Sequence, residues 1–429
     1  MTAYKRHPYL RRNGTVGVMD HGYVPRLVDP VLRELVAELP AVMLTGPRAT
    51  GKTTTARRLA ATVIRLDRTA EAAAFKADAD AALRSLAEPV LLDEWQAAPA
   101  VLGAVKRAVD DDPRPGRYLL TGSVRADLDA DTWPGTGRLV RLPMFGLTTR
   151  ELRRVEGKLF MDAIVADTYM PTVPPDAPDL RGYVELAVQS GFPEAVLNLS
   201  PAVRERWLES YVDQLITRDA EHVDGGRDPE RLRRYFEATA LNSAGVVDLS
   251  TIYEAASVNR RTAGAYDQLL KNLMVLDTLP AWTSNRLKRL IRRPKRYLVD
   301  VGLMAAALRL DVDGVMRDGD ILGRVLDTFV ASQIRAEVPV SASRPRIFHA
   351  RSQQGRNEID LLAELAAGRV VGIEVKATAS PSVKDARHLS WLKDQLGDRF
   401  IRGIVLHTGP RAYELTDSIG AAPICSLWT

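Results

Sequence analysis

The sequence contains a single cysteine and no long apolar run. Cys425 has no second cysteine to pair with, so no internal disulfide can form. No Cys/His cluster offers the ligand spacing of a zinc site. No run approaches the roughly eighteen consecutive apolar residues of a membrane-spanning helix. The basic amino terminus, residues 1–14, is followed by no apolar signal-peptide core, so we expect a cytoplasmic protein without a membrane partner.

The composition is that of a folded chain with a mild positive charge. It is 46% hydrophobic and 26% charged, which excludes an intrinsically disordered protein. A chain of 429 residues is long enough for several domains, each with its own core. The 59 Lys and Arg residues against 54 Asp and Glu residues give a net charge of +5. This excess permits a nucleic-acid partner but does not by itself indicate one.

The strongest motif is a phosphate-binding loop. The run GPRATGKT matches G-x-x-x-x-G-K-[ST], follows the apolar run AVMLT and precedes a helix-forming segment, as the motif requires. We expect it to bind ATP through Gly46, Pro47, Arg48, Ala49, Thr50, Gly51, Lys52, Thr53 and Thr54. Lys52 would reach the β and γ phosphates, and the Thr53 hydroxyl would be a ligand of Mg²⁺.

Two further apolar runs end in polar residues. The run PVLLDE ends in Asp93 and Glu94, and carboxylates at the carboxyl end of a buried strand lie beside the phosphates. We expect Asp93 to order the Mg²⁺ shell and Glu94 to deprotonate the attacking water. The run YLLTGS places Thr121 or Ser123 where a hydroxyl senses the γ phosphate or positions the water.

These motifs together resemble a known family. GPRATGKT, LLDEWQAAP and LLTGS are similar to the GPRxxGKT, DExQ and LTGS motifs of AAA+-related P-loop ATPases of bacteria and archaea. The resemblance continues through four more segments, GFPE at 191–194, RD at 218–219, PKRY at 294–297 and DVGL at 300–303. It implies an ATPase core, a winged-helix region and a carboxy-terminal domain of unknown function with a nuclease-like fold.

Two arginines are candidates for a catalytic finger at the γ phosphate. Arg138 lies in a Gly-rich turn after the LTGS segment, and Arg218 lies late in a predicted helix. Such an arginine acts within one chain or in a neighbouring subunit. A finger that acts in a neighbouring subunit would require a homo-oligomer. A structural ion pair is the alternative role for both residues.

A predicted helix, a tight turn and a second helix at 260–272 lead into an apolar strand, which suggests a winged helix-turn-helix. Arg260 and Arg261 open the second helix, where side chains of such modules meet nucleic acid. Seven cations without an intervening acid follow in the segment 286–296 and resemble a phosphate-tracking strand: Arg286, Lys288, Arg289, Arg292, Arg293, Lys295 and Arg296. A solvated hairpin, or a module that binds a protein partner, is the alternative.

The carboxy-terminal region carries a D…E-x-K arrangement. Asp360 precedes an apolar strand, and Glu374 and Lys376 share one face of the next strand. This resembles the core of the PD-(D/E)xK nucleases, in which two carboxylates hold Mg²⁺ and the lysine assists the attacking water. The helical acid that such enzymes often add aligns with Asp327. The alternative is a domain that keeps the fold without turnover.

We therefore predict an α/β multidomain protein with a parallel P-loop NTPase sheet and a PD-(D/E)xK-like carboxy-terminal domain. The expected domains are an ATPase core with its lead-in (1–160), a Pro-rich connection and helical lid (161–230), a winged helix-turn-helix (231–295) and a restriction-endonuclease-like domain (296–429). The predicted function is Mg²⁺-dependent ATP hydrolysis coupled to rearrangement on nucleic acid or a partner protein. The alternatives are a slow nucleotide-gated switch and an ATP-controlled nuclease.

Overall fold

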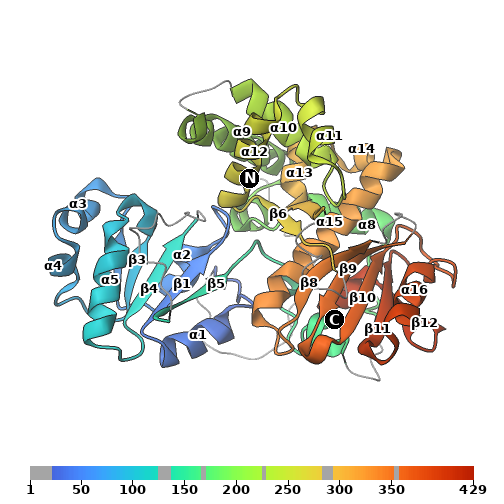
Figure 1. The fold of residues 1–429 in the computed structure, drawn as a ribbon, viewed down its shortest axis with the longest axis horizontal. Coiled ribbons are helices and arrows are strands. Elements are labelled where there is room, and N and C mark those ends of the chain that lie inside the picture. The colour runs from blue at the N-terminus through green and yellow to red at the C-terminus, as the bar shows by residue number, and fades with distance from the viewer. Residues whose placement is uncertain (1–21, 124–136, 166–170, 225–228, 283–292, 352–356) are drawn as a thin grey trace, which may run out of the picture.

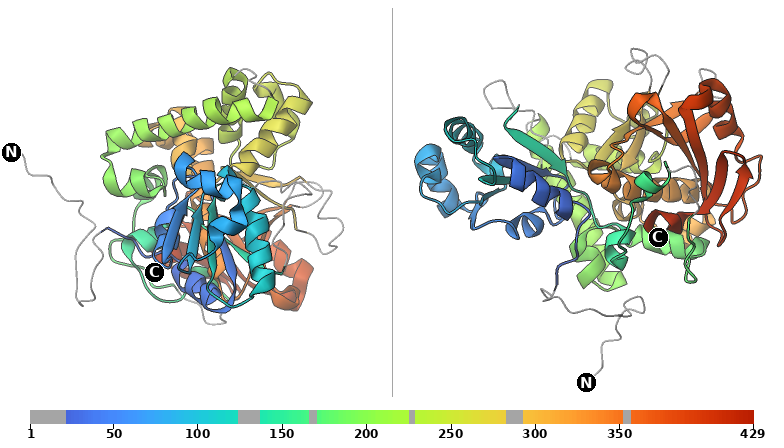
Figure 2. Two further views of the ribbon diagram at one scale, coloured as in Figure 1. Left: turned by 90° about the vertical axis from the view of Figure 1, so that its left-hand side faces the viewer. Right: turned by 90° about the horizontal axis from the view of Figure 1, so that it is seen from below.

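The computed structural model describes residues 22–123, 137–165, 171–224, 229–282, 293–351 and 357–429, with residues 218–224 described by their backbone alone. The chain forms two large sheets at opposite ends of the molecule and one two-stranded sheet, with a helical region between and above the large sheets (Figure 1). The view from below shows the same separation of the sheets (Figure 2). In the described part of the chain, no helix has the length and apolar character needed to cross a bilayer.

The amino-terminal sheet has five strands, and every described pairing in it is parallel. Its order is β2-β3-β4-β1-β5, so β4 lies between β1 and β3. The strands are β1 (Ala41–Thr45), β2 (Thr62–Arg65), β3 (Val90–Asp93), β4 (Tyr118–Gly122) and β5 (Leu139–Pro143). β1, β3 and β4 coincide with the apolar runs AVMLT, PVLLDE and YLLTGS, and the prediction of a parallel α/β sheet is confirmed.

Helices cover both faces of this sheet, which explains why its central strands are apolar throughout. Met43, Leu92 and Leu120 face the core on the α5 side, whereas Val42 and Leu44 face α1 and α2. The elements of this region are α1 (Asp29–Glu38), α2 (Lys52–Arg57), α3 (Thr69–Ala77), α4 (Ala79–Leu83), the 3₁₀ turn η1 (Trp95–Ala97) and α5 (Ala100–Asp111).

The middle region is helical and contains one two-stranded hairpin, in which β6 pairs antiparallel with β7. Its long helix α9 crosses the top of the molecule (Figure 2). The elements are α6 (Thr149–Arg153), α7 (Phe160–Ala163), α8 (Leu180–Val188), the π-helical turn η2 (Glu194–Asn198), α9 (Pro201–Asp224), α10 (Pro229–Leu241), α11 (Leu249–Ala255), α12 (Arg260–Asn272), β6 (Leu276–Leu279), β7 (Lys295–Leu298), α13 (Val301–Leu308) and α14 (Val312–Arg317).

The carboxy-terminal region is a mixed sheet with the strand order β12-β13-β11-β10-β9-β8. Alternating residues face opposite sides: Leu361 and Ile373 join the core with α15, and Leu362 and Val370 pack with α16. The elements are α15 (Gly319–Glu337), η4 (Val338–Val340), β8 (Arg346–Arg351), β9 (Glu358–Glu364), η5 (Ala366–Gly368), β10 (Val370–Val375), α16 (Arg387–Leu396), η6 (Gly397–Arg399), β11 (Phe400–His407), β12 (Tyr413–Thr416), β13 (Ile419–Pro423) and η7 (Ile424–Trp428).

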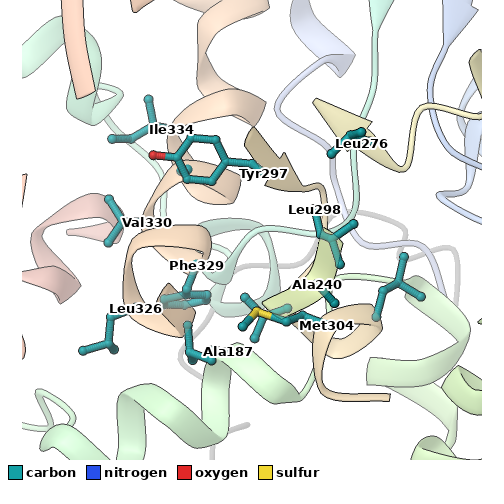
Figure 3. Packing of buried hydrophobic residues seen from close by; sticks show 14 of the residues in the cluster. Ala187, Ala240, Leu276, Tyr297, Leu298, Met304, Leu326, Phe329, Val330 and Ile334 are labelled. Atoms are coloured by element: carbon teal, nitrogen blue, oxygen red, sulfur yellow. The ribbon is translucent and has the colours of Figure 1, made fainter. Parts of the chain in front are cut away.

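The middle and carboxy-terminal regions share one hydrophobic core. It runs from Phe160 to Trp428 and includes residues of α8, α10, β7, α13 and α15. Figure 3 shows Tyr297 and Leu298 of the hairpin in the same cluster as Phe329 and Val330 of α15. The expected domain boundary between residues 295 and 296 falls inside β7 (Lys295–Leu298), whose residues are all buried and which packs against α15.

Candidate functional site

The phosphate loop joins β1 to α2 and depends on two glycines. Gly46 has φ 159°, close to extended backbone, and a Cβ atom there would lie 1.9 Å from the carbonyl oxygen of Met144. Gly51 adopts the left-handed region at φ 92° and immediately precedes α2. The Thr50 hydroxyl donates to the carbonyl oxygen of Pro47 at 2.9 Å. The loop is therefore held by close backbone packing, and its amide groups surround the amino end of a helix.

Lys52 lies inside this loop. Its Nζ donates to the carbonyl oxygens of Gly46 at 3.0 Å and Pro47 at 2.7 Å. Burial lowers the pKa of Lys52 to about 8, and the carboxylates of Glu94 and Asp93 only partly offset this effect. The ammonium group is thus placed at the loop with acceptors that phosphate oxygens can replace.

Asp93, at the end of β3, accepts hydrogen bonds from two side chains on neighbouring elements. The Thr53 hydroxyl, at the start of α2, donates to Asp93 Oδ1 at 2.7 Å, and the Thr121 hydroxyl of β4 donates to the same oxygen. Parallel strands end at one edge of a sheet, so β1, β3 and β4 bring these residues together. A hydroxyl and one carboxylate are oxygen ligands of the kind Mg²⁺ prefers beside substrate phosphates.

Glu94 follows Asp93 in a left-handed conformation, with φ 55° and ψ 49°. Its Oε2 accepts hydrogen bonds from the amide of Gln96 and from the Ser123 hydroxyl, the latter at 3.3 Å. Gly122 makes this turn possible, because a Cβ atom there would lie 2.4 Å from Trp95 Nε1. The carboxylate is thus oriented by two side chains, and the role of Gln96 was not assigned from the sequence although it belongs to the DExQ motif.

Arg26 is a residue of this site that the sequence did not indicate. Its guanidinium donates to the carbonyl oxygen of Thr50 at 2.8 Å and to that of Phe145 at 2.7 Å. It also forms a buried ion pair with Glu151, 3.0 Å from Nε to Oε1. Arg26 stands in no recognisable motif, so only the fold reveals that it supports the phosphate loop.

A cavity of about 570 Å³ lies beside the phosphate loop, between α2 and the segment that precedes α1. The Tyr23 hydroxyl bonds to Asp29 at 2.8 Å and to Thr55 at 3.1 Å, and the Arg58 guanidinium lies 4.2 Å from the centre of the Tyr23 ring. Thr54, which is exposed, opens onto the same space. Its lining residues are Gly22, Tyr23, Val24, Arg26, Gly51, Thr54, Thr55, Arg57, Arg58, Leu147, Pro193 and Leu197.

Comparison with protein families agrees with this geometry. Residues 38–153 match the family model described as an AAA domain, and this range contains the whole phosphate site except Arg26. Residues 38–153 therefore form an AAA domain with a P-loop. Residues 180–314 and 322–427 match two further models, each described as a domain of unknown function (DUF8612 and DUF4143).

Two mycobacterial proteins are similar to this chain in sequence, and one solved structure matches part of it. Two uncharacterized proteins, from Mycobacterium bovis and Mycobacterium tuberculosis, are each 27% identical over 404 residues, covering 93% of this chain and 83% of theirs. The solved structure of a Walker-type ATPase of Pyrococcus abyssi matches with 16% identity and a TM-score of 0.40, over 66% of this chain and 94% of that one.

The structure describes the side chain of one of the two candidate arginine fingers, Arg138. Arg138 precedes β5, whose first residue pairs with Ala41 at the start of β1. The phosphate loop follows the other end of β1, about 13 Å away at roughly 3.3 Å per residue. Arg138 pairs with Asp110, the structural role that the sequence left as the alternative, and its role as a finger stays a prediction. Arg218 lies in α9, but its side chain is outside the described residues.

The segment 286–296 differs from the prediction. Arg286, Lys288, Arg289 and Arg292 lie outside the described residues. Arg293 is exposed and pairs with Asp248 at 2.6 Å. Lys295 and Arg296, however, are buried. Arg296 pairs with Asp267, and Lys295 pairs with Asp327 and Asp360, so their assignment to a phosphate-tracking strand is wrong.

The carboxy-terminal acids come together, but around a lysine. Lys295 Nζ lies 2.6 Å from Asp327 Oδ2 and 2.8 Å from Asp360 Oδ1, and Lys376 pairs with Glu374 at 3.1 Å. Burial opposes the charge of Lys295, but the two aspartates outweigh it and raise its pKa well above the usual value. Among the described residues, no group of three or more acidic, histidine or cysteine side chains is arranged to hold a metal ion. Lysine side chains thus pair with the carboxylates of the predicted Mg²⁺ site, and the site stays a prediction.

Proposed function

We propose that this protein is a Mg²⁺-dependent ATPase whose nucleotide state is transmitted from the phosphate loop to the middle region, which engages nucleic acid. The observation that carries the proposal is that the phosphate loop contacts both the carboxylates of the ATPase site and helix α9 of the middle region. On one side the loop leads to Thr53, Asp93 and Glu94. On the other, the Tyr211 hydroxyl of α9 donates to the carbonyl oxygen of Arg48 at 3.3 Å.

The residues present fit ATP with Mg²⁺. Lys52 and the loop amides offer positive charge to the phosphate chain, and the cavity beside Tyr23 offers an aromatic face and room for a base. Thr53 and Asp93 would hold Mg²⁺, which neutralises developing charge on the phosphate oxygens. The hydrogen bond between Thr53 and Asp93 shows that both side chains already converge on one point.

The hydrogen bonds of Glu94 support a role as the general base. Its Oε2 is held by Gln96 and Ser123, so the carboxylate keeps one orientation. A water in line with the γ phosphate would pass its proton to Glu94 as the water oxygen attacks phosphorus and the bond to the β–γ bridging oxygen breaks. ADP is the leaving group. Ser123 therefore acts by positioning Glu94, and Thr121 acts by holding Asp93.

An aromatic cluster connects the phosphate loop to α9. The rings of Phe192 and Tyr211 lie 4.8 Å apart, and the ring of Trp207 lies 5.7 Å from Phe192 and 5.6 Å from Tyr211. Arg48 and Ala49 of the loop line a cavity of about 270 Å³ with residues of α9 and with Leu273 and Val275. Movement of the loop on nucleotide binding would therefore press on α9 and on the end of α12.

Gly191 precedes Phe192 of the aromatic cluster and forms hydrogen bonds with Leu147 and with Asp300. Its carbonyl oxygen accepts from Leu147 N at 2.6 Å, and its amide donates to Asp300 Oδ2 at 2.8 Å. A Cβ atom at Gly191 would lie 2.7 Å from the carbonyl oxygen of Leu147, so only glycine allows this approach. Asp300 also caps α13, accepting from Leu303 N at 3.2 Å. The segments GFPE and DVGL thus meet at the exit of the AAA domain.

Nucleic acid is the partner that the surface of α12 favours. Arg260 and Arg261 are exposed at the start of this helix, and Asn259 caps it by accepting from Thr262 N at 2.9 Å. The order α11, α12, β6 and β7 supports a winged helix-turn-helix, in which the amino end of the second helix enters a groove. The two guanidinium groups would meet phosphates or base edges there.

The test is steady-state ATP hydrolysis with and without double- and single-stranded DNA. Wild type should be stimulated by DNA, and Arg260→Ala/Arg261→Ala should lose the stimulation while keeping the basal rate. The charge-matched control is Arg33→Ala/Arg399→Ala, because both residues are exposed on elements remote from α12. Slow turnover that ignores DNA in every variant would contradict nucleic-acid coupling and would instead support a nucleotide-gated switch that responds to a protein partner.

A further inference from the structure

The most unusual buried group outside the ATPase site is the ammonium of Lys295. The residue is 1% exposed and lies on β7, the second strand of the hairpin. Its Nζ contacts a carboxylate of α15, Asp327, and a carboxylate of β9, Asp360, at 2.6 and 2.8 Å. One cation from the middle region thus joins two anions of the carboxy-terminal region.

The second oxygen of each carboxylate also accepts a hydrogen bond from the protein. Asp327 Oδ1 accepts from the Tyr297 hydroxyl at 2.9 Å, and Asp360 Oδ2 accepts from Val375 N at 3.0 Å. Lys295 and Tyr297 are two residues apart on one strand, so their side chains lie on the same face. The hairpin therefore satisfies Asp327 with two donors and Asp360 with one.

This arrangement leaves no place for a metal ion between the two aspartates. A divalent cation bound there would sit about 2.0–2.6 Å from a carboxylate oxygen of each. Lys295 Nζ already lies within 2.8 Å of both oxygens, and a second cation in the same buried space would be repelled. Glu374 stands next to this pair, with Oε2 bound to Lys376 and with a buried Oε1 that has no hydrogen-bond partner.

We propose that Lys295 takes the place of the divalent cation that a nuclease-like fold implies, so that the acids of the carboxy-terminal domain bind the β6–β7 hairpin instead of a metal. Two consequences follow for the molecule. Asp327, Asp360 and Glu374 do not support metal-dependent phosphodiester cleavage while Lys295 is in position. Removal of the ammonium exposes a carboxylate set that a divalent cation can occupy.

The experiment measures binding of Mn²⁺ to the nucleotide-free, full-length protein by electron paramagnetic resonance. The variants are wild type, Asp360→Asn, Lys295→Ala and the double variant Lys295→Ala/Asp360→Asn. We expect wild type and Asp360→Asn to bind Mn²⁺ equally. Lys295→Ala should gain one site with at least tenfold tighter binding than wild type, and the double variant should lose it.

A second readout protects the test against simple misfolding. Mn²⁺ should raise the unfolding temperature of Lys295→Ala but not that of wild type, because the added ion replaces the missing positive charge. Lys295→Met, which keeps the apolar stem of the side chain, serves if Lys295→Ala does not fold. Mn²⁺ binding by wild type that Asp360→Asn abolishes would overturn the proposal, and so would a folded Lys295 variant that gains no Mn²⁺ site.

Discussion

Arg26 and Glu151 form a buried ion pair across 125 residues of sequence, with Nε 3.0 Å from Oε1. Arg26 precedes α1, and Glu151 belongs to the capping box of α6, in which Thr148 and Glu151 satisfy each other's backbone amides. Because Arg26 also donates to the carbonyl oxygen of Thr50, the pair links the phosphate loop to the segment that leaves the AAA domain.

We expect Arg26→Met to destabilise the AAA domain by about 3–5 kcal/mol, because it leaves the Glu151 carboxylate buried without its counter-ion. ATP affinity should fall as well, since the Thr50 carbonyl loses its donor. Urea unfolding and titration with a fluorescent ATP analogue measure the two effects. The matched variant Arg26→Met/Glu151→Gln carries no buried unpaired charge and should recover much of the lost stability; a double variant no more stable than Arg26→Met would contradict the ion-pair argument.

Glu94→Gln should keep ATP binding and lose turnover, because the amide cannot accept the proton of the attacking water. General-base removal typically costs about 10²–10⁴-fold in rate. Single-turnover hydrolysis and ATP binding, measured on the same preparation, separate the two steps. Turnover within about twofold of wild type would show that another group is the base.

Ser123→Ala and Thr121→Val should distinguish the role of the Glu94 carboxylate from that of the Asp93 carboxylate. Loss of the Ser123 hydroxyl frees Glu94 Oε2 from one donor, so kcat should fall roughly tenfold with little change in the Mg²⁺ requirement. Loss of the Thr121 hydroxyl removes a donor from Asp93, so the Mg²⁺ concentration for half-maximal activity should change instead. The rate of ATP hydrolysis is measured against Mg²⁺ concentration for both variants. Identical curves would argue against separate roles for Ser123 and Thr121.

ATP affinity should weaken above about pH 8 because of Lys52. Burial lowers the pKa of Lys52 to about 8 in the free protein, whereas bound phosphates favour its charged form. Binding therefore takes up a proton above that pH, and affinity should fall by up to tenfold per pH unit. Calorimetry in buffers of different ionisation enthalpy measures the proton uptake. Lys52→Arg stays charged and is the control. An equal pH dependence of ATP affinity in wild type and Lys52→Arg would show that Lys52 is not the titrating group.

Tyr211→Phe should reduce stimulation of ATP hydrolysis by DNA, because it removes the hydroxyl that donates to the Arg48 carbonyl and leaves the ring in the aromatic cluster. Thr217→Ala is the control on the same helix, since the Thr217 hydroxyl donates within α9, to the carbonyl oxygen of Asp213. We expect Thr217→Ala to behave as wild type. If Tyr211→Phe is stimulated as strongly as wild type, the contact does not transmit the nucleotide state.

Local sequence determined the parts of this protein that depend on neighbouring residues. Gly46 to Thr53 form the phosphate loop because glycine geometry and the start of a helix are properties of a short segment. Asp93 and Thr121 were expected beside it because parallel strands end at one edge, and the Thr53–Asp93 hydrogen bond has that origin.

Tertiary structure alone decided which charged residues face solvent and which pair in the interior. Lys295 and Arg296 follow other cations in sequence, yet both are buried, and α15, β9 and α12 supply the carboxylates that pair with them. Arg138 is close to the LTGS strand in sequence but lies at the far edge of the sheet, because β5 starts beside Ala41. Arg26 gains its role from Glu151 and Thr50. Burial and ion pairing depend on segments far apart along the chain, and no local pattern specifies them.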